Sequence, residues 1–198
     1  MYIGTHNSGT GEKLVWWQRP FSFILNPFAR CQSRNTVHQL RDGVKVFNLQ
    51  VTYHDGEWRF SHGLCIYKSE LFDTIKLMKK YATEEEPIYY QLFLDRNFLK
   101  PRNKKGFIEL VKTLKAHSKK ENVKLLYAWI EGTNEYPYIN RTKIDLCENY
   151  WTSSWAKNNA KTWIDKLPLP KRHAKQHNHE YIENNKHKYL MLDFYEYK

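Results

Sequence analysis

Short apolar runs alternate with helical patterns along most of the chain. Runs rich in β-branched and aromatic residues predict strands, and apolar residues spaced by three and four predict helices. Strands are expected at Tyr2–Thr5, Val44–Tyr53, Trp58–Ser61, Ile88–Leu94, Val123–Ile130, Tyr150–Trp155 and Tyr189–Phe194. Helices are expected after a capping residue at Ser69, around Phe107–Leu114 and over Thr162–Leu167.

The order of these elements indicates an α/β fold. Strands that alternate with helices pair in parallel through helical crossovers, and continuous apolar strands fit a sheet that is buried on both faces. Seven strands come close to the eight of a (β/α)8 TIM-like barrel. Because we find no internal repeat and no clear linker, residues 1–198 are expected to form one domain.

The composition adds a strong positive charge. Lys and Arg outnumber Asp and Glu by 32 to 21, and the formal charge of +11 favours phosphate esters, acidic lipid headgroups or nucleic acid as partners. Nucleic acid is the least expected of these, since nothing resembles a helix-turn-helix, an RRM or a zinc finger. The cysteines Cys31, Cys65 and Cys147 are odd in number and widely spaced, which indicates reduced thiols.

Membrane and targeting signals are not found in the sequence. No apolar run reaches the roughly 20 residues of a membrane-spanning helix. The first residues, Met1–His6, lack the basic and apolar regions of a secretory leader. We therefore expect a cytoplasmic protein or one that binds a membrane peripherally.

Two histidines and one acid stand at the ends of expected strands. His6 follows the first strand, His62 follows the third, and Asp193 lies near the end of the last. Reacting groups gather at the carboxyl ends of strands in α/β barrels, where the first and last strands are neighbours. Asp193 is therefore expected to orient His6, and the two imidazoles form an acid–base pair suited to cleaving a phosphodiester.

Three segments, read in order, resemble a known family. Ile3–Thr10, Gln39–Gln50 and Phe60–Gly63 look like the catalytic (X) domain of phosphatidylinositol-specific phospholipase C, with matching separations. The strand after Pro87 and the closing Met191–Phe194 fit the bacterial branch of that family. The similarity covers residues 1–95 and the last ten residues, and it is poor between them.

The resemblance implies a fold and a reaction. The fold is a compact, distorted barrel with reduced helices. Members cleave the phosphodiester between glycerol and inositol through attack of the inositol 2-hydroxyl on phosphorus. By the same resemblance His6 matches the general base, His62 matches the general acid, and Asp193 matches the acid that supports the base.

The residues that would meet the phosphate depart from the family. Bacterial members have an acid at the position of Asn7 and Asp-x-Arg at the positions of Asn48 and Gln50, whereas calcium-dependent members have Glu-x-Asp there. The three amides remain candidate phosphate contacts. They are also the candidate Ca²⁺ ligands, but a Ca²⁺ site normally includes several carboxylates, so the sequence favours no required cofactor.

Other charges follow the strand that ends at Leu94. Arg96 and Arg102 are candidates for neutralising a bound phosphate, and ordinary solvated loop charges are the alternative. Asp95 is a candidate for holding a metal or orienting a neighbouring residue. The basic, His-rich segment Lys171–Lys188 is expected to be solvated rather than to bind a metal.

An aromatic segment, Leu14–Leu25, follows the His6 loop. Bacterial members use such a segment at the lipid interface, which makes Trp16, Trp17, Phe21 and Phe23 candidates for contact with an anionic membrane surface. The alternative is that these side chains pack inward as a lid or as core.

Two functions remain in view. The first is a phospholipase C-type phosphodiesterase that uses His6 and His62 on a phosphoinositide-like substrate. The second is a catalytically weakened or inactive barrel that binds phospholipid headgroups or other phosphate esters. The neutral residues Asn48 and Gln50 are the reason for the second.

Overall fold

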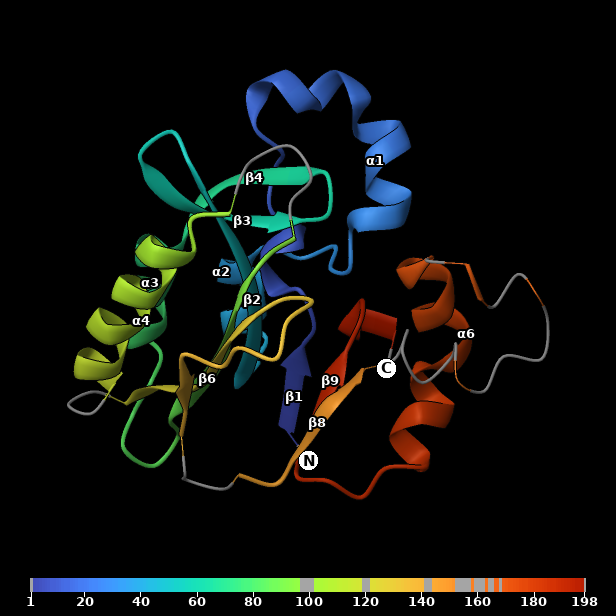
Figure 1. Cartoon of the computed structure of the whole chain (residues 1–198). Helices are drawn as coiled ribbons and strands as arrows, with labels where there is room; N and C mark the ends of the chain where they lie inside the picture. The colour runs from blue at the N-terminus through green and yellow to red at the C-terminus, as the bar shows by residue number, and fades with distance from the viewer. Residues whose placement is uncertain are drawn as a thin grey trace.

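The computed structural model describes residues 2–96, 102–118, 122–140, 144–151, 158, 163, 166–167 and 169–197. Figure 1 shows their helices and strands. In chain order these are β1 (Tyr2–Thr5), η1 (Ser8–Gly11), η2 (Trp16–Phe21), α1 (Ser22–Ala29), α2 (Thr36–Arg41), β2 (Val46–His54), β3 (Glu57–His62), β4 (Cys65–Glu70), α3 (Leu71–Lys79), β5 (Ile88–Leu94), α4 (Lys104–Ser118), β6 (Val123–Ile130), β7 (Tyr138–Ile139), β8 (Leu146–Trp151), α6 (Pro170–Glu183), β9 (Tyr189–Leu192) and η4 (Tyr195–Tyr197).

The strands belong to one sheet. Its order is β7-β6-β5-β2-β1-β9-β8, with β3 paired to β2 and β4 paired to β3. The pairs β6/β5, β5/β2, β2/β1, β1/β9 and β9/β8 are parallel. The expected α/β class is therefore confirmed. The central strands carry apolar side chains on both faces because helices cover the sheet.

The closed barrel is not formed by the residues that the structure describes. β7 and β8 stand at the two ends of the strand order and do not pair with each other within the described ranges. β7 is also antiparallel to β6. Only residues 140–145 separate β7 from β8. That connection is too short for the helical crossover that would add another parallel strand.

β3 runs antiparallel to β2, an orientation that the sequence did not predict. Asp55 and Gly56 both have positive φ (52° and 82°) and form the two-residue turn of a hairpin. Val51 pairs with both Leu94 of β5 and Phe60 of β3. β2 therefore extends past the end of β5, and β3 folds back toward the carboxyl edge of the parallel strands.

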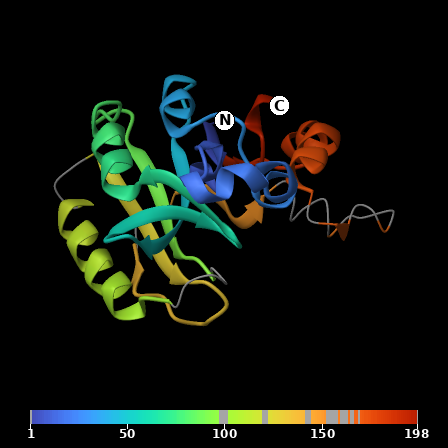
Figure 2. The same cartoon turned by 90° about the horizontal axis from the view of Figure 1, so that it is seen from above.

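The helices lie on different sides of the sheet. α3 and α4 stand together at one side, and α6 stands beside β9 at the other (Figure 1). Seen from above, α1 crosses the end of the molecule where the parallel strands finish (Figure 2). α3 begins at Leu71 and not behind a Ser69 cap, since Ser69 belongs to β4. β4 was missed because its residues mix polar and apolar types without clear alternation.

The C-terminal half agrees with expectation only in part. The last strand and the strand at Val123–Ile130 are present as predicted. The strand expected at Tyr150–Trp155 is seen as Leu146–Trp151, and the rest of that range, like most of Thr162–Leu167, lies outside the described residues. The segment expected to be solvated forms α6, where His173 is fully buried.

Candidate active site

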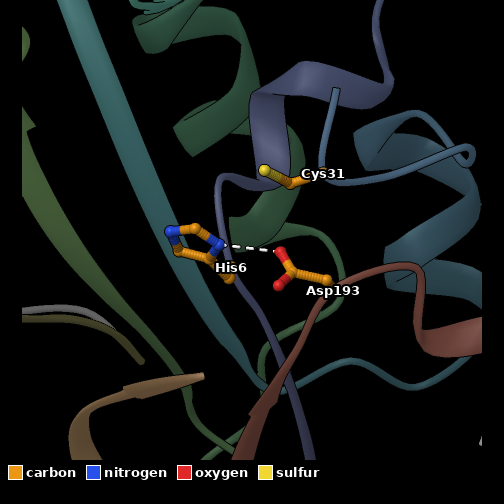
Figure 3. A group of neighbouring side chains, drawn as sticks. All are labelled: His6, Cys31 and Asp193. Carbon is orange, nitrogen blue, oxygen red and sulfur yellow. Dashed lines mark hydrogen bonds and ion pairs between the residues drawn. The ribbon is translucent and has the colours of Figure 1, made fainter. Parts of the chain in front are cut away.

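His6 and Asp193 meet where the first and last strands end. Thr5 of β1 pairs with Leu192 of β9. The residues that follow them, His6 and Asp193, therefore lie at the same edge of the sheet. The ring nitrogen Nδ1 of His6 lies 2.8 Å from Oδ1 of Asp193, and both residues are buried (Figure 3). Because Nδ1 faces the carboxylate as a donor, Nε2 carries the lone pair of the neutral ring and is the atom able to accept a proton.

Two buried amides hold this pair in place. Nε2 of Gln32 donates to the carbonyl oxygens of His6 (2.9 Å) and Leu192 (2.7 Å), which ties the two strand ends together. Nδ2 of Asn178, on α6, donates to the carbonyl oxygen of Asp193 at 3.0 Å. Sequence reasoning missed both amides, since nothing local connects positions 32 and 178 with a histidine at position 6.

Asn7 and Asn48 have structural partners. Oδ1 of Asn48 accepts from the backbone N–H of Asn7 at 3.1 Å, and Nδ2 of Asn48 donates to Gln91 at 3.0 Å. Asn7 has a left-handed backbone (φ 45°), which this contact helps to hold. Asn48 therefore shapes the loop that follows His6, and its expected role as a phosphate contact competes with these two bonds.

A calcium ion does not fit these residues. Oδ1 of Asn7 and Oε1 of Gln50 are buried acceptors without a hydrogen-bond partner among the described residues, but both are neutral amide oxygens. Oδ1 of Asn48 is already used by the Asn7 N–H. Ca²⁺ requires six to eight oxygen ligands, normally with several carboxylates, and these three positions supply none.

His62 is the second imidazole of the site and the last residue of β3. Its Nδ1 donates to the carbonyl oxygen of Ala29, at the end of α1, over 2.6 Å. The pKa of His62 is lowered from its ordinary value of 6.5, chiefly because burial removes water from the ring. The Ala29 carbonyl opposes this shift, and the charge of nearby His6 adds to it.

His62 lies within electrostatic range of His6. His6 lowers the pKa of His62, whereas the carboxylates of Glu131 and Asp193 raise it. These three groups follow β1, β6 and β9, so the ends of separate strands surround one ring. The segment between Ala29 and Cys31 forms a wall common to both histidines, since Ala29 contacts His62 and Cys31 lies beside His6.

Cys31 is drawn together with the His6–Asp193 pair in Figure 3. One ligand atom from each of His6, Cys31 and Asp193 lies within 4.8 Å of the others, and all three residues are buried. A thiolate-binding metal such as Zn²⁺ could use this set. In the structure Nδ2 of Asn7 donates to the sulfur over 3.6 Å, so Cys31 takes part in a hydrogen-bond network. The sequence predicted a reduced thiol at Cys31 and no place for it in the site.

Asp95 follows β5 and lies under the His62 turn. It is 2% exposed, and its carboxyl interacts with the backbone N–H of Gly63, with Ser61 and with Glu131. Burial, together with the Glu131 carboxyl, raises the pKa of Asp95 to about 7. Since Ser61 and Gly63 flank His62, Asp95 supports the turn that carries the ring. The expected roles of Asp95, holding a metal or orienting a neighbouring residue, stay predictions, and the sequence did not point to Glu131.

Arg96 and Arg102 approach one another near Gly132. A side-chain atom at Gly132 would lie 3.9 Å from Nη1 of Arg96 and 4.0 Å from Nη2 of Arg102. The backbone N–H of Arg96 donates to Glu131 at 2.8 Å. The two guanidinium groups therefore lie near Gly132, the residue that follows Glu131, whose carboxylate raises the pKa of His62.

Comparisons with known proteins agree on the architecture. No family model and no curated protein matches the sequence. Among solved structures, a variant of the phosphatidylinositol-specific phospholipase C from Staphylococcus aureus superposes with a TM-score of 0.62 at 16% identity, over 100% of this chain and 86% of that one. The Listeria monocytogenes enzyme of the same name gives 0.59 at 15% identity, over 98% and 87%. The chain has the fold of the bacterial phosphatidylinositol-specific phospholipases C. The resemblance read from the sequence is thus confirmed for the fold.

On this phospholipase C fold the aromatic segment points outward. Trp16 is 78% exposed and Phe23 is 74% exposed, and Trp17 and Phe21 are also exposed. α1 has no fully buried residue although its sequence is mostly apolar. The alternative of an inward lid or core is therefore wrong for these four side chains. None of the described helices is long and apolar enough to cross a membrane.

The lowered pKa of His62 predicts how turnover depends on pH. In the role of general acid that the sequence predicts, His62 must be protonated, and desolvation makes that protonation harder than in water. We therefore expect kcat/KM to fall as the pH rises, with the midpoint of this fall below pH 6.5. The measurement is a profile of kcat/KM from about pH 4.5 to 8 with a substrate that does not titrate in that range. A midpoint above about pH 7 would contradict the assignment of His62 as the acid.

Proposed function

We propose that this chain is a phosphodiesterase of phospholipase C type that cleaves a phosphoinositide-like lipid. The observation that carries the proposal is the buried His6–Asp193 contact of 2.8 Å, with His62 in the same electrostatic environment. A base with a fixed tautomer and a separate acid are the two groups needed for phosphodiester cleavage.

The proposed reaction has two proton transfers, one from the attacking hydroxyl and one to the leaving oxygen. Nε2 of His6 accepts the proton of a headgroup hydroxyl as its oxygen attacks phosphorus. The bond from phosphorus to the glycerol oxygen breaks, and His62 donates a proton to that oxygen. The products are a cyclic phosphate and diacylglycerol. Asp193 stabilises the imidazolium that forms on His6.

The residues that neutralise the negative charge of the phosphate are expected to differ from those of the bacterial family. The strand β2 offers Gln50 where the bacterial family has arginine, so no cation reaches the phosphate from that position. Arg96 and Arg102 converge at the rim near Gly132, and we assign them the role of neutralising the phosphate. The formal charge of +11 adds attraction for an anionic surface.

The direct test is turnover of a phosphoinositide and of a simple aryl phosphodiester by the intact chain. Product formation that depends on His6 and His62 supports the proposal, and turnover unaffected by replacing both residues would sink it. The second candidate function is a headgroup-binding protein without turnover. It is favoured by the two hydrogen bonds that engage Asn48, and it predicts retention of phosphoinositide without product.

The exposed aromatic segment predicts binding to lipid vesicles. One solved structure of the S. aureus enzyme with this fold concerns modulation of its membrane binding. Here the double substitution Trp16→Ala and Phe23→Ala is expected to weaken binding to anionic vesicles by a factor of about 100, since each large apolar side chain contributes roughly 1.5–3 kcal/mol when buried. Vesicle sedimentation measures the effect. Phe72→Ala is the control, since Phe72 is exposed on α3. Equal weakening by the control would contradict the prediction.

A further inference from the structure

An apolar pocket opens beside His62. It has a volume of about 340 Å³, and Ile24, Leu25, Phe28, Leu64 and His62 are among the residues that line it. Ala29, Gly63 and Cys65 complete the lining. The walls come from α1 on one side and from the turn between β3 and β4 on the other. Among these described lining residues, His62 is the only titratable side chain apart from the buried Cys65.

The pocket adjoins the exposed surface of α1. Ile24, Phe28 and Leu64 are each about half exposed, at 53%, 54% and 46%. α1 also carries Phe23, which is more exposed and does not line this pocket. The apolar surface proposed to meet the membrane therefore continues into this pocket, whose lining includes His62.

The position of the general acid identifies what belongs in this pocket. In the proposed reaction His62 protonates the oxygen that leaves phosphorus, so the leaving group must lie against His62. The headgroup hydroxyl lies on the side of His6. We infer that the pocket between α1 and the β3–β4 turn is the subsite for the diacylglycerol leaving group, and that it holds the glycerol unit and the first methylenes of an acyl chain. This inference rests on the proposed function.

Size and chemistry both fit that occupant. A volume of about 340 Å³ lies at the lower end of the range for small-molecule pockets, too small for two full acyl chains. The apolar lining would bury methylenes favourably, at roughly 0.8 kcal/mol for each. A soluble, polar leaving group gains nothing from Ile24, Phe28 or Leu64. The pocket therefore makes an acylated lipid a better substrate than its deacylated, water-soluble counterpart.

The test compares two monomeric substrates, so that vesicle binding does not enter. These are dihexanoyl phosphatidylinositol, below its micelle concentration, and glycerophosphoinositol. Leu64→Ser is expected to lower the ratio of kcat/KM for the two substrates by about tenfold, with the value for glycerophosphoinositol unchanged. Leu64→Trp, which fills the pocket, is expected to lower the same ratio. Since Leu64 is 46% exposed, neither change removes core packing.

Phe23→Ser is the matched control. It removes an exposed apolar side chain from the same helix without touching the pocket, and it is expected to weaken vesicle binding while leaving the substrate ratio unchanged. An equal effect of Leu64→Ser on both substrates would overturn the inference. So would a ratio near one in the unaltered protein.

If the protein shows no turnover, the subsite can still be tested by ligand binding. Dihexanoylglycerol is then titrated into the protein, and the methyl resonances of Leu64 and Ile24 are followed by NMR. Saturable shifts that are lost in Leu64→Trp support the leaving-group subsite even if the catalytic proposal fails. No shift at any soluble concentration would overturn the subsite on its own.

Discussion

Replacing His62 by alanine is expected to lower kcat on a phosphoinositide by a factor on the order of 10³, since a positioned general acid contributes about 10²–10⁴. The protein should stay folded, because His62 is half-buried at the end of β3 and the substitution removes a single hydrogen bond, the one to the Ala29 carbonyl. KM is expected to change little. His117→Ala, an exposed position on α4, is the control and should retain full activity. Comparable losses in the two variants would count against His62 as the acid.

His6 needs a gentler substitution than alanine. His6→Ala would leave the fully buried carboxylate of Asp193 without its 2.8 Å partner, which costs stability as well as activity. His6→Asn retains an N–H donor near the position of Nδ1 but has no basic nitrogen. It is therefore expected to fold and to lose a comparable factor in kcat. Combining it with His62→Ala should lose less than the product of the two factors, because the two groups act in one step.

The second large effect is expected on stability, at Gly11→Ala. A Cβ at Gly11 would lie 1.8 Å from the carbonyl oxygen of Arg34 and 2.5 Å from its carbonyl carbon. Backbone cannot move aside as a flexible side chain can, so we expect a loss of about 3 kcal/mol or more in the free energy of unfolding. Urea unfolding measures it as a fall in the midpoint.

Gly43→Ala separates this steric effect from backbone strain. Gly43 has a φ of 80°, and a Cβ added to it would meet no atom of the described residues within 4 Å. Its substitution should cost only about 1–2 kcal/mol, the strain of a left-handed backbone. Equal losses at Gly11 and Gly43 would show that the contact with Arg34 is not tight. The contact matters for function because it packs the His6 loop against the segment that contains Gln32.

The framework of the sheet was predictable from local pattern. The apolar runs Ile88–Leu94 and Val123–Ile130 are strands with the expected bounds, since they are buried on both faces. β4 and the antiparallel course of β3 were not predicted. Their pairing depends on the turn at Asp55 and Gly56, whose residue types favour a turn but do not fix which strands pair across it.

The part of the site that could be predicted from the sequence consists of residues that directly follow strands. The contact of His6 with Asp193 was expected because the first and last strands were expected to be neighbours, and it is present although the described sheet is open. The supports at Gln32, Asn178 and Glu131 were missed. Each contacts a group that is distant in sequence, and an isolated Gln, Asn or Glu carries no local pattern that marks it.

The pairing of β1 with β9 makes the proposed general base depend on two segments that are far apart in the sequence. A chain that has lost the residues beyond Lys188 keeps the β2–β3 hairpin with its histidine, but has neither the neighbour strand of β1 nor Asp193. Under the proposed function, proteolytic loss of that segment is therefore expected to abolish turnover. Adding a separate peptide that supplies the missing strand and Asp193 is then expected to restore turnover.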